Sequence, residues 1–210
     1  MYISYYGLNR EPFENTPDPD FLYLSKKHRE VLASLMYGIE SGKGFVMIVG
    51  DVGTGKTTLI QTVLRNISQS SFLVLHILNP RPSFKEILLY ICEKIKLKIN
   101  GLSTFEIMER LKARLEKFSD HGIKILLIID EAHHLSEESL EDIRLLSNLE
   151  NENRKLIQIL LAGQNELYRT LEKDSLRQLR QRIVIYRSLE RLDKKEIGRA
   201  SCRERVCHRV

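Results

Sequence analysis

Eight consecutive residues, Gly50 to Thr57, have the types and spacing of a phosphate-binding loop. They satisfy the pattern GxxxxGK[ST] directly after an apolar run and before a helical one. Glycines permit the positive φ angles that let backbone N–H groups surround phosphate oxygens, and a helix N-terminus favours anions. Lys56 would bring charge to the β and γ phosphates, and Thr57 a hydroxyl to Mg²⁺. A plain glycine-rich turn is the alternative. The predicted ATP-binding residues are Gly50, Asp51, Val52, Gly53, Thr54, Gly55, Lys56, Thr57 and Thr58.

Two acids, Asp130 and Glu131, end the apolar run 125–129 and form the second candidate group. Ligands of open α/β sheets bind beyond the carboxyl ends of the strands, so Asp130 should lie beside the phosphate loop. Asp130 would hold Mg²⁺ through water together with Thr57, and Glu131 would orient and activate the attacking water. An acid-rich helix N-terminus is the alternative explanation of this pair.

His133 and His134 follow the two acids. Adjacent histidines point apart on a helix or a strand, which disfavours a metal site formed by this pair. The string Asp130-Glu131-Ala132-His133 also occurs in one class of helicases. A helicase needs a second motor domain, for which the chain has no room.

The elements that must position these residues alternate between strands and helices. Strands are expected at 45–49, 72–78, 123–129, 156–162 and 183–189. Helices are expected at 28–40, 56–68 and 136–149, and after the capping boxes Ser83 with Glu86 and Ser103 with Glu106. This alternation predicts an α/β fold of the P-loop NTPase, AAA+ type, an open parallel five-stranded sheet with helices on both faces.

Composition and the ends of the chain limit the class of protein. With 42% hydrophobic and 29% charged residues, the 210 residues suit one globular domain. Neither a membrane span nor a secretory leader is recognisable, so we expect a cytoplasmic fragment without membrane contact. Residues 197–210 are aperiodic and resemble translated sequencing adapter, so we treat them as foreign. They carry four arginines and one glutamate, and without them the net charge falls from +5 to +2.

Beyond the two motifs, further short segments are spread over residues 1–196. They are Tyr5-Tyr6-Gly7-Leu8, Pro12-Phe13, Pro17, Phe21-Leu22-Tyr23, Ser25, His28, Gly163-Gln164-Asn165-Glu166-Leu167 and Leu176-Arg177-Gln178-Leu179-Arg180-Gln181-Arg182. With the phosphate loop and Asp130-Glu131-Ala132, they resemble the ExeA type of general secretion pathway A proteins. Asn165 stands where that family often has proline.

The resemblance implies an AAA+ ATPase domain on the cytoplasmic side of the bacterial inner membrane. A lid, a transmembrane anchor and a periplasmic peptidoglycan-binding region would follow it, and the full-length protein would form a homo-oligomer with an inner-membrane secretion partner. Gln164 matches the sensor 1 region of the family. The arginine finger, which reaches the nucleotide of a neighbouring subunit, matches Arg177, Arg180 or Arg182. The open alternatives are a polar turn residue for Gln164 and solvated helix charges for the arginines.

We expect the chain to divide into four parts. Residues 1–27 form an aromatic N-terminal arm, which packs on the domain or touches the nucleotide base. Residues 28–190 form the ATPase core, 191–196 begin a missing lid, and 197–210 are the foreign tail. The leading function is ATP hydrolysis that energises or switches assembly of a secretion or pilus system. The alternative is a DNA-linked regulator such as a transposition helper ATPase, although the low net charge disfavours nucleic acid.

Overall fold

A parallel sheet of five strands organises the computed structural model, which describes residues 23–67, 71–78, 83–151 and 154–198. The strands are β1 (Phe45–Gly50), β2 (Phe72–Ile77), β3 (Lys124–Ile129), β4 (Ile157–Gly163) and β5 (Ile183–Leu189). Their order in space is β2-β3-β4-β1-β5. The predicted fold class is therefore confirmed, and the strand order is new information.

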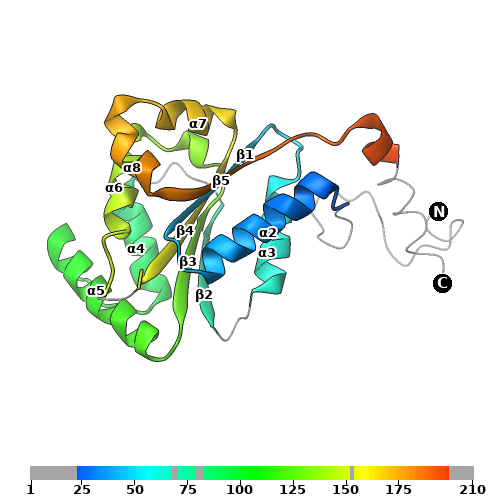
Figure 1. Cartoon of the computed structure of the whole chain (residues 1–210). Coiled ribbons are helices and arrows are strands. Elements are labelled where there is room, and N and C mark those ends of the chain that lie inside the picture. Colours follow the sequence, from blue (N-terminus) through cyan, green and yellow to red (C-terminus); the bar gives the residue numbers. More distant parts are fainter. Residues whose placement is uncertain (1–22, 68–70, 79–82, 152–153, 199–210) are drawn as a thin grey trace, which may run out of the picture.

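Helices cover both faces of this sheet (Figure 1). One face carries α2 (Lys26–Glu40) and α3 (Lys56–Asn66). The other carries α4 (Phe84–Lys94), α5 (Thr104–Asp120), α6 (Glu137–Leu146), α7 (Asn165–Leu171) and α8 (Arg177–Arg182). Every residue of β1 and β4 is buried, because strands covered on both faces bury both sets of alternating side chains. These strands hold the functional loops in fixed register.

Side-chain caps start several of the helices where the sequence predicts them. Ser83 and Ser103 each exchange hydrogen bonds with the glutamate three residues on, so both predicted capping boxes are confirmed. The helix expected at 136–149 begins after its N-cap Ser136 but ends at Leu146. The Ser147 hydroxyl donates to the Arg144 carbonyl at 2.6 Å, a local bond that competes with further helix.

The two ends of the chain lie largely outside the described residues, including 1–22 of the predicted arm and 199–210 of the predicted tail. Asp193 and Glu196 exchange N–H to carboxylate bonds of 3.0 and 2.7 Å, as their spacing predicts. The short helix that they open covers 194–198, and its Ile197 is 52% exposed. Within the described ranges, every helix is too short or too polar to cross a bilayer.

Candidate active site

The phosphate loop joins β1 to α3 at the carboxyl end of the sheet (Figure 1). Gly53 and Gly55 have φ of 79° and 87°, in the left-handed region that glycine adopts without a steric penalty. Gly55 is the N-cap of α3, and no side chain caps this helix. The first-turn N–H groups of α3 are therefore available to an anionic ligand, whose charge the helix dipole also favours.

Lys56 supplies the cation of this loop. It is only 6% exposed, and its Nζ donates to the carbonyl oxygens of Gly50 at 2.8 Å and Asp51 at 2.9 Å. Among the described residues it has no carboxylate partner. Because an uncompensated buried charge costs several kcal/mol, the arrangement fits a ligand that brings negative charge into the loop.

The two predicted motifs meet through Thr57 and Asp130. The Thr57 hydroxyl donates to Oδ2 of Asp130 at 2.9 Å, and the Glu131 N–H donates to Oδ1 at 2.9 Å. Asp130 is 3% exposed, and its own N–H donates to the Ile77 carbonyl at 3.0 Å. A hydroxyl beside a held carboxylate is an oxygen-only donor set, which suits Mg²⁺.

Glu131 lies next to this pair in an unusual backbone conformation. Its φ is 54°, a left-handed geometry that costs a non-glycine residue about 1–2 kcal/mol. Such strain clusters at functional sites, where the surrounding structure maintains it. The Glu131 side chain remains 38% exposed, so its carboxylate is accessible to water.

Gln164 and His133 meet on the other side of Glu131. Gln164 directly follows β4 and is the N-cap of α7, and its Nε2 lies 3.0 Å from His133 Nε2. His133 belongs to the 3-10 turn η2 (Ala132–His134), and its Nδ1 lies 3.4 Å from a Glu131 carboxylate oxygen. The predicted sensor residue, the predicted base and one histidine therefore form a single cluster.

The two neighbouring histidines do not point apart, contrary to the sequence expectation. In the 3-10 turn, the rings of His133 and His134 lie 4.0 Å apart at an angle of 38°. Ligand atoms of Glu131, His133 and His134 lie within 4.8 Å of one another. Tetrahedral zinc with bonds near 2.0 Å holds its ligand atoms about 3.4 Å apart. We therefore do not assign a zinc site to this cluster.

Asp51 takes part in the site through its side chain as well as its backbone. Its Oδ1 accepts from Nδ2 of Asn165 at 2.8 Å, and its Oδ2 lies 3.8 Å from Nε of Arg191. The phosphate loop thereby contacts the first residue of α7 and the segment after β5. Sequence reasoning missed this contact, because it joins residues 114 positions apart.

His28 is a second residue whose role the sequence does not reveal, although it belongs to the segments that carry the family resemblance. It is 3% exposed at the start of α2. Its Nε2–H donates to the Thr54 carbonyl at 3.2 Å, and Nδ1 lies 2.8 Å from the Ser25 hydroxyl. The first described helix is thus tied directly to the phosphate loop.

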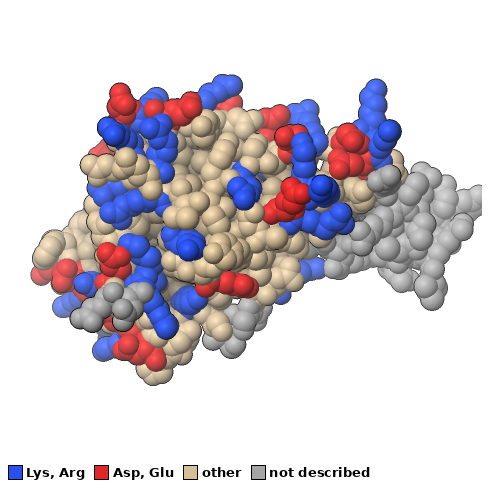
Figure 2. All heavy atoms as spheres, viewed as in Figure 1, with Lys and Arg blue, Asp and Glu red and all other residues tan. Residues whose placement is uncertain are grey.

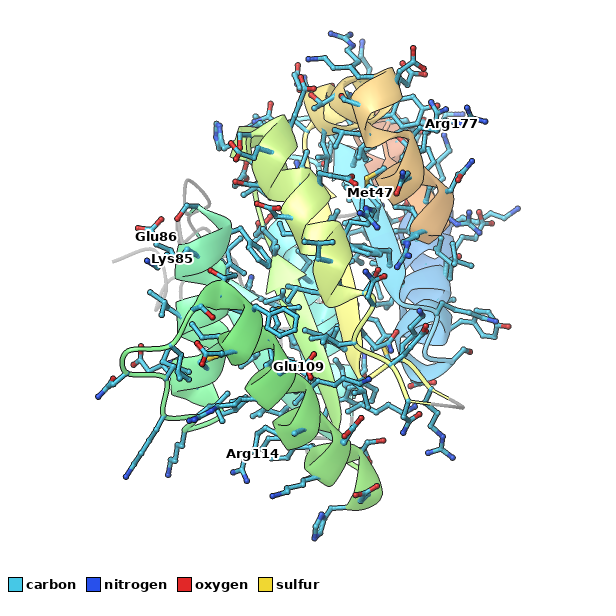
Figure 3. The ribbon with its side chains drawn as sticks, turned by 90° about the vertical axis from the view of Figure 1, so that its left-hand side faces the viewer. Met47, Lys85, Glu86, Glu109, Arg114 and Arg177 are labelled. Atoms are coloured by element: carbon cyan, nitrogen blue, oxygen red, sulfur yellow. The ribbon has the colours of Figure 1, made fainter. Side chains whose placement is uncertain are left out.

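The predicted arginines lie on α8, away from their own phosphate loop. In the register of β5 with β1, Ile183 pairs with Phe45, and Leu189 pairs with Gly50 at the start of the loop. A strand rises about 3.3 Å per residue. Arg182, just before β5, therefore lies about 20 Å along the sheet from the loop. Arg182 donates to the Ser147 hydroxyl, and Arg180 reaches the Glu172 carbonyl at 3.5 Å. Figure 3 shows Arg177 at the outer edge of the molecule.

A cavity of about 1200 Å³ lies at the opposite, amino end of the sheet. Its lining includes Lys124 and Lys155, but Lys155 is paired with Glu150, and Lys124 donates to the Glu40 carbonyl at 2.8 Å. Acidic and basic side chains also alternate over the face in Figure 2, without a patch of one sign. The phosphate loop, its buried lysine and the paired acids all lie at the carboxyl end of the sheet.

Sheet order, phosphate loop, buried lysine and paired acids together define a P-loop NTPase domain of the AAA+ type. Comparison with known families agrees, since the family model described as AAA domain matches residues 39–171. The chain belongs to this AAA family.

Relatives support the same assignment. General secretion pathway protein A of Aeromonas hydrophila is 38% identical over 191 residues, which cover 88% of this chain. The chain spans only 34% of that relative. The Aeropyrum pernix ORC2 protein, solved in ADPNP–ADP complexes, superposes with a TM-score of 0.69 at 18% identity, covering 94% of this chain and 55% of its own. Cdc6p of Pyrobaculum aerophilum superposes with a TM-score of 0.61 at 16% sequence identity, and the match covers 97% of this chain and 53% of Cdc6p. These structures share the fold.

Proposed function

We propose that this domain binds ATP with Mg²⁺ and hydrolyses it to ADP and phosphate. One observation carries the proposal. The Thr57 hydroxyl contacts the Asp130 carboxylate at 2.9 Å, directly beside Glu131. This contact unites a phosphate-binding loop, a Mg²⁺-binding pair and a candidate base at one end of the sheet.

Each residue then has a chemical task. The loop N–H groups and Lys56 hold the phosphates, and Thr57 and Asp130 would hold Mg²⁺, which neutralises charge on the phosphate oxygens when bound. Glu131 accepts the proton of the attacking water, for which its partly exposed carboxylate is suited. Gln164 orients that water or the terminal phosphate.

An arginine of α8 completes the site of a neighbouring subunit in this proposal. Arg180 is exposed, whereas Arg182 is partly buried and bound to Ser147. Both lie on a helix that precedes β5, too far along the sheet to serve their own loop. Removing such a finger lowers the rate about 10³- to 10⁵-fold in other P-loop enzymes, so turnover should require assembly into a homo-oligomer.

We also propose that the ATPase energises or switches assembly of a bacterial secretion or pilus system, in a full-length protein anchored in the inner membrane. The support is the 38% identity to general secretion pathway protein A. The resemblance to ORC2 and Cdc6p at 18% and 16% identity extends to the fold alone. It gives no specific support to a DNA-linked function.

Glu131→Gln tests the enzymatic part. The amide keeps the shape of the carboxylate but is a poor base, so turnover should fall about 10²- to 10⁴-fold while Mg-ATP still binds. Glu138→Gln, at an exposed position of α6, is the matched control and should turn over normally. The measurement is phosphate release at saturating ATP by the full-length protein, and equal rates in both variants would refute the assignment of Glu131.

A chimera tests the secretion part. Residues 23–189 replace the matching segment of the Aeromonas hydrophila relative in a strain that lacks it. We expect the chimera to restore secretion and the same chimera with Glu131→Gln to fail. A chimera that is produced and hydrolyses ATP without restoring secretion would contradict this part alone.

A further inference from the structure

His133 is the only member of the Glu131 and Gln164 cluster, among the described residues, that touches both of the others. Its side chain is 8% exposed, whereas that of Glu131 is 38% exposed. The ring is thus held in the protein, while the carboxylate that it contacts faces water. A buried ring in contact with an exposed carboxylate is the arrangement expected of a residue that sets the orientation of that carboxylate.

The backbone brings the three residues together by a close approach between η2 and β4. A Cβ atom on Gly163, the last residue of β4, would lie 3.1 Å from the backbone nitrogen of His133 and 3.0 Å from Leu167. A side chain at position 163 would therefore require the backbone at His133 and the side chain of Leu167 to move by a few tenths of an ångström. Glycine there keeps His133 within reach of Gln164, the next residue.

Hydrogen-bond chemistry limits how the neutral ring can serve both neighbours. With the Gln164 amide N–H donating to Nε2 at 3.0 Å, the ring proton must be on Nδ1. Nδ1–H then faces the Glu131 carboxylate at 3.4 Å. In the opposite tautomer, Nδ1 would instead accept from the Gln164 backbone N–H, also at 3.4 Å. The first arrangement follows from the orientation of the Gln164 amide in the structure, and exchanging the amide oxygen and nitrogen gives the second.

The surroundings of this ring disfavour its charged form, because they lower the pKa of His133. Burial is the main cause that lowers the pKa of His133, and the charges of His134 and Lys56 lower it further. Glu131 and Glu166 act in the opposite direction. A neutral ring can accept a hydrogen bond from the Gln164 amide at one nitrogen and direct an N–H toward Glu131 at the other. An imidazolium has no acceptor nitrogen and would repel the Gln164 N–H donor.

We propose that His133 is a positioning residue for ATP hydrolysis, which ties the Glu131 carboxylate to Gln164 and holds it toward the attacking water. This inference rests on the proposed function, because it assigns Glu131 as the base. Among the described residues, the hydrogen bonds of His133 go to Gln164 and not to the phosphate loop, so nucleotide binding should depend on His133 only weakly. Its effect should appear in kcat and not in KM.

Single and double variants test the proposal in the same ATPase assay. Misplacing a catalytic group by about 1 Å can cost 10²-fold, so His133→Ala should lower kcat about 10- to 100-fold with ATP affinity unchanged within about twofold. His133→Asn, which can offer an N–H near the position of Nδ1–H, should recover part of the loss. His121→Ala, at an exposed histidine at the end of α5, is the matched control.

The double variant distinguishes this inference from the proposed function. If His133 acts through Glu131, adding His133→Ala to Glu131→Gln should slow turnover no further, because effects within one unit are not additive. Independent, multiplying effects or a normal kcat in His133→Ala would overturn the role of His133. Normal turnover in Glu131→Gln alone would instead refute the proposed function.

NMR spectroscopy of the unmodified chain gives a test that depends neither on ATPase activity nor on the folding of a variant. Nitrogen chemical shifts of the histidine rings identify the tautomer of His133 in the unmodified chain. We expect the proton on Nδ1 at neutral pH. A ring protonated only on Nε2 would contradict the proposed contact of Nδ1–H with the Glu131 carboxylate.

Discussion

Replacing His28 by alanine should weaken both the fold and the nucleotide site. Because a carbonyl oxygen can only accept, the Thr54 contact at 3.2 Å puts the ring proton on Nε2, and Ser25 donates to Nδ1 at 2.8 Å. His28 and Thr54 are 3% and 5% exposed. Water therefore has little access to replace the lost donor.

The size of the effect follows from these contacts. A buried carbonyl left without its donor costs about 1–3 kcal/mol, and the space left by the ring brings the total to about 2–4 kcal/mol. In a domain of this size, each kcal/mol lowers Tm by about 2–4 °C. The midpoint of His28→Ala should therefore fall by about 5–15 °C. Mg-ATP should bind more weakly, because Thr54 belongs to the loop that holds the phosphates.

Thermal unfolding followed by circular dichroism, together with calorimetric titration of Mg-ATP, measures both effects. His121→Ala is the control, since His121 is exposed at the end of α5 and its ring, within the described part of the chain, bonds to the nearby Lys117 carbonyl. His28→Gln, which keeps a donor for Thr54, should recover part of the loss. A His28→Ala variant as stable as His121→Ala, or one destabilised with unchanged ATP affinity, would refute the reasoning.

Two other positions give further predictions. Asn165→Pro should change the free energy of unfolding by less than about 1 kcal/mol, because proline is favoured at the first position of a helix and this gain offsets the lost contact with Asp51. Urea unfolding measures this change. A loss above about 2 kcal/mol, the size expected when a buried network is broken, would contradict the prediction. Burial raises the pKa of the Cys92 thiol from 9.0 to about 11, so Cys92 should react with thiol reagents only after unfolding, as peptide mapping can show. Since the folded thiol binds its proton more tightly, stability should fall between about pH 9 and 11 in urea titrations, and a flat profile or rapid labelling would contradict the burial.

Local signals in the sequence predict much of this fold. The capping boxes at Ser83 and Ser103 involve residues three apart, so spacing alone places the starts of α4 and α5. The phosphate loop is equally local, because its glycines, its lysine and the strand and helix around it are contiguous. The apolar run before Asp130 also places the acids at a strand end, beside the loop as expected.

Contacts between segments that are distant in the sequence could not be predicted from residue types and spacing. The link from His133 to Gln164 requires β3 and β4 to be neighbours and η2 to be a 3-10 turn, and neither follows from residue spacing. The left-handed backbone of Glu131 is likewise held by its surroundings, since propensity disfavours it. Sequence reasoning could therefore name Glu131 and Gln164 separately, but it could not join them through His133.

The central claim is that the loop around Lys56 binds ATP, and calorimetric titration of Mg-ATP tests it most directly. Lys56→Ala removes the buried charge that faces the phosphates, and Lys85→Ala, at an exposed lysine of α4 (Figure 3), is the matched control. Thermal unfolding checks that both variants remain folded. We predict saturable binding to the unmodified chain and to Lys85→Ala, and none to folded Lys56→Ala. Equal affinity in all three proteins would contradict the assignment of the phosphate loop.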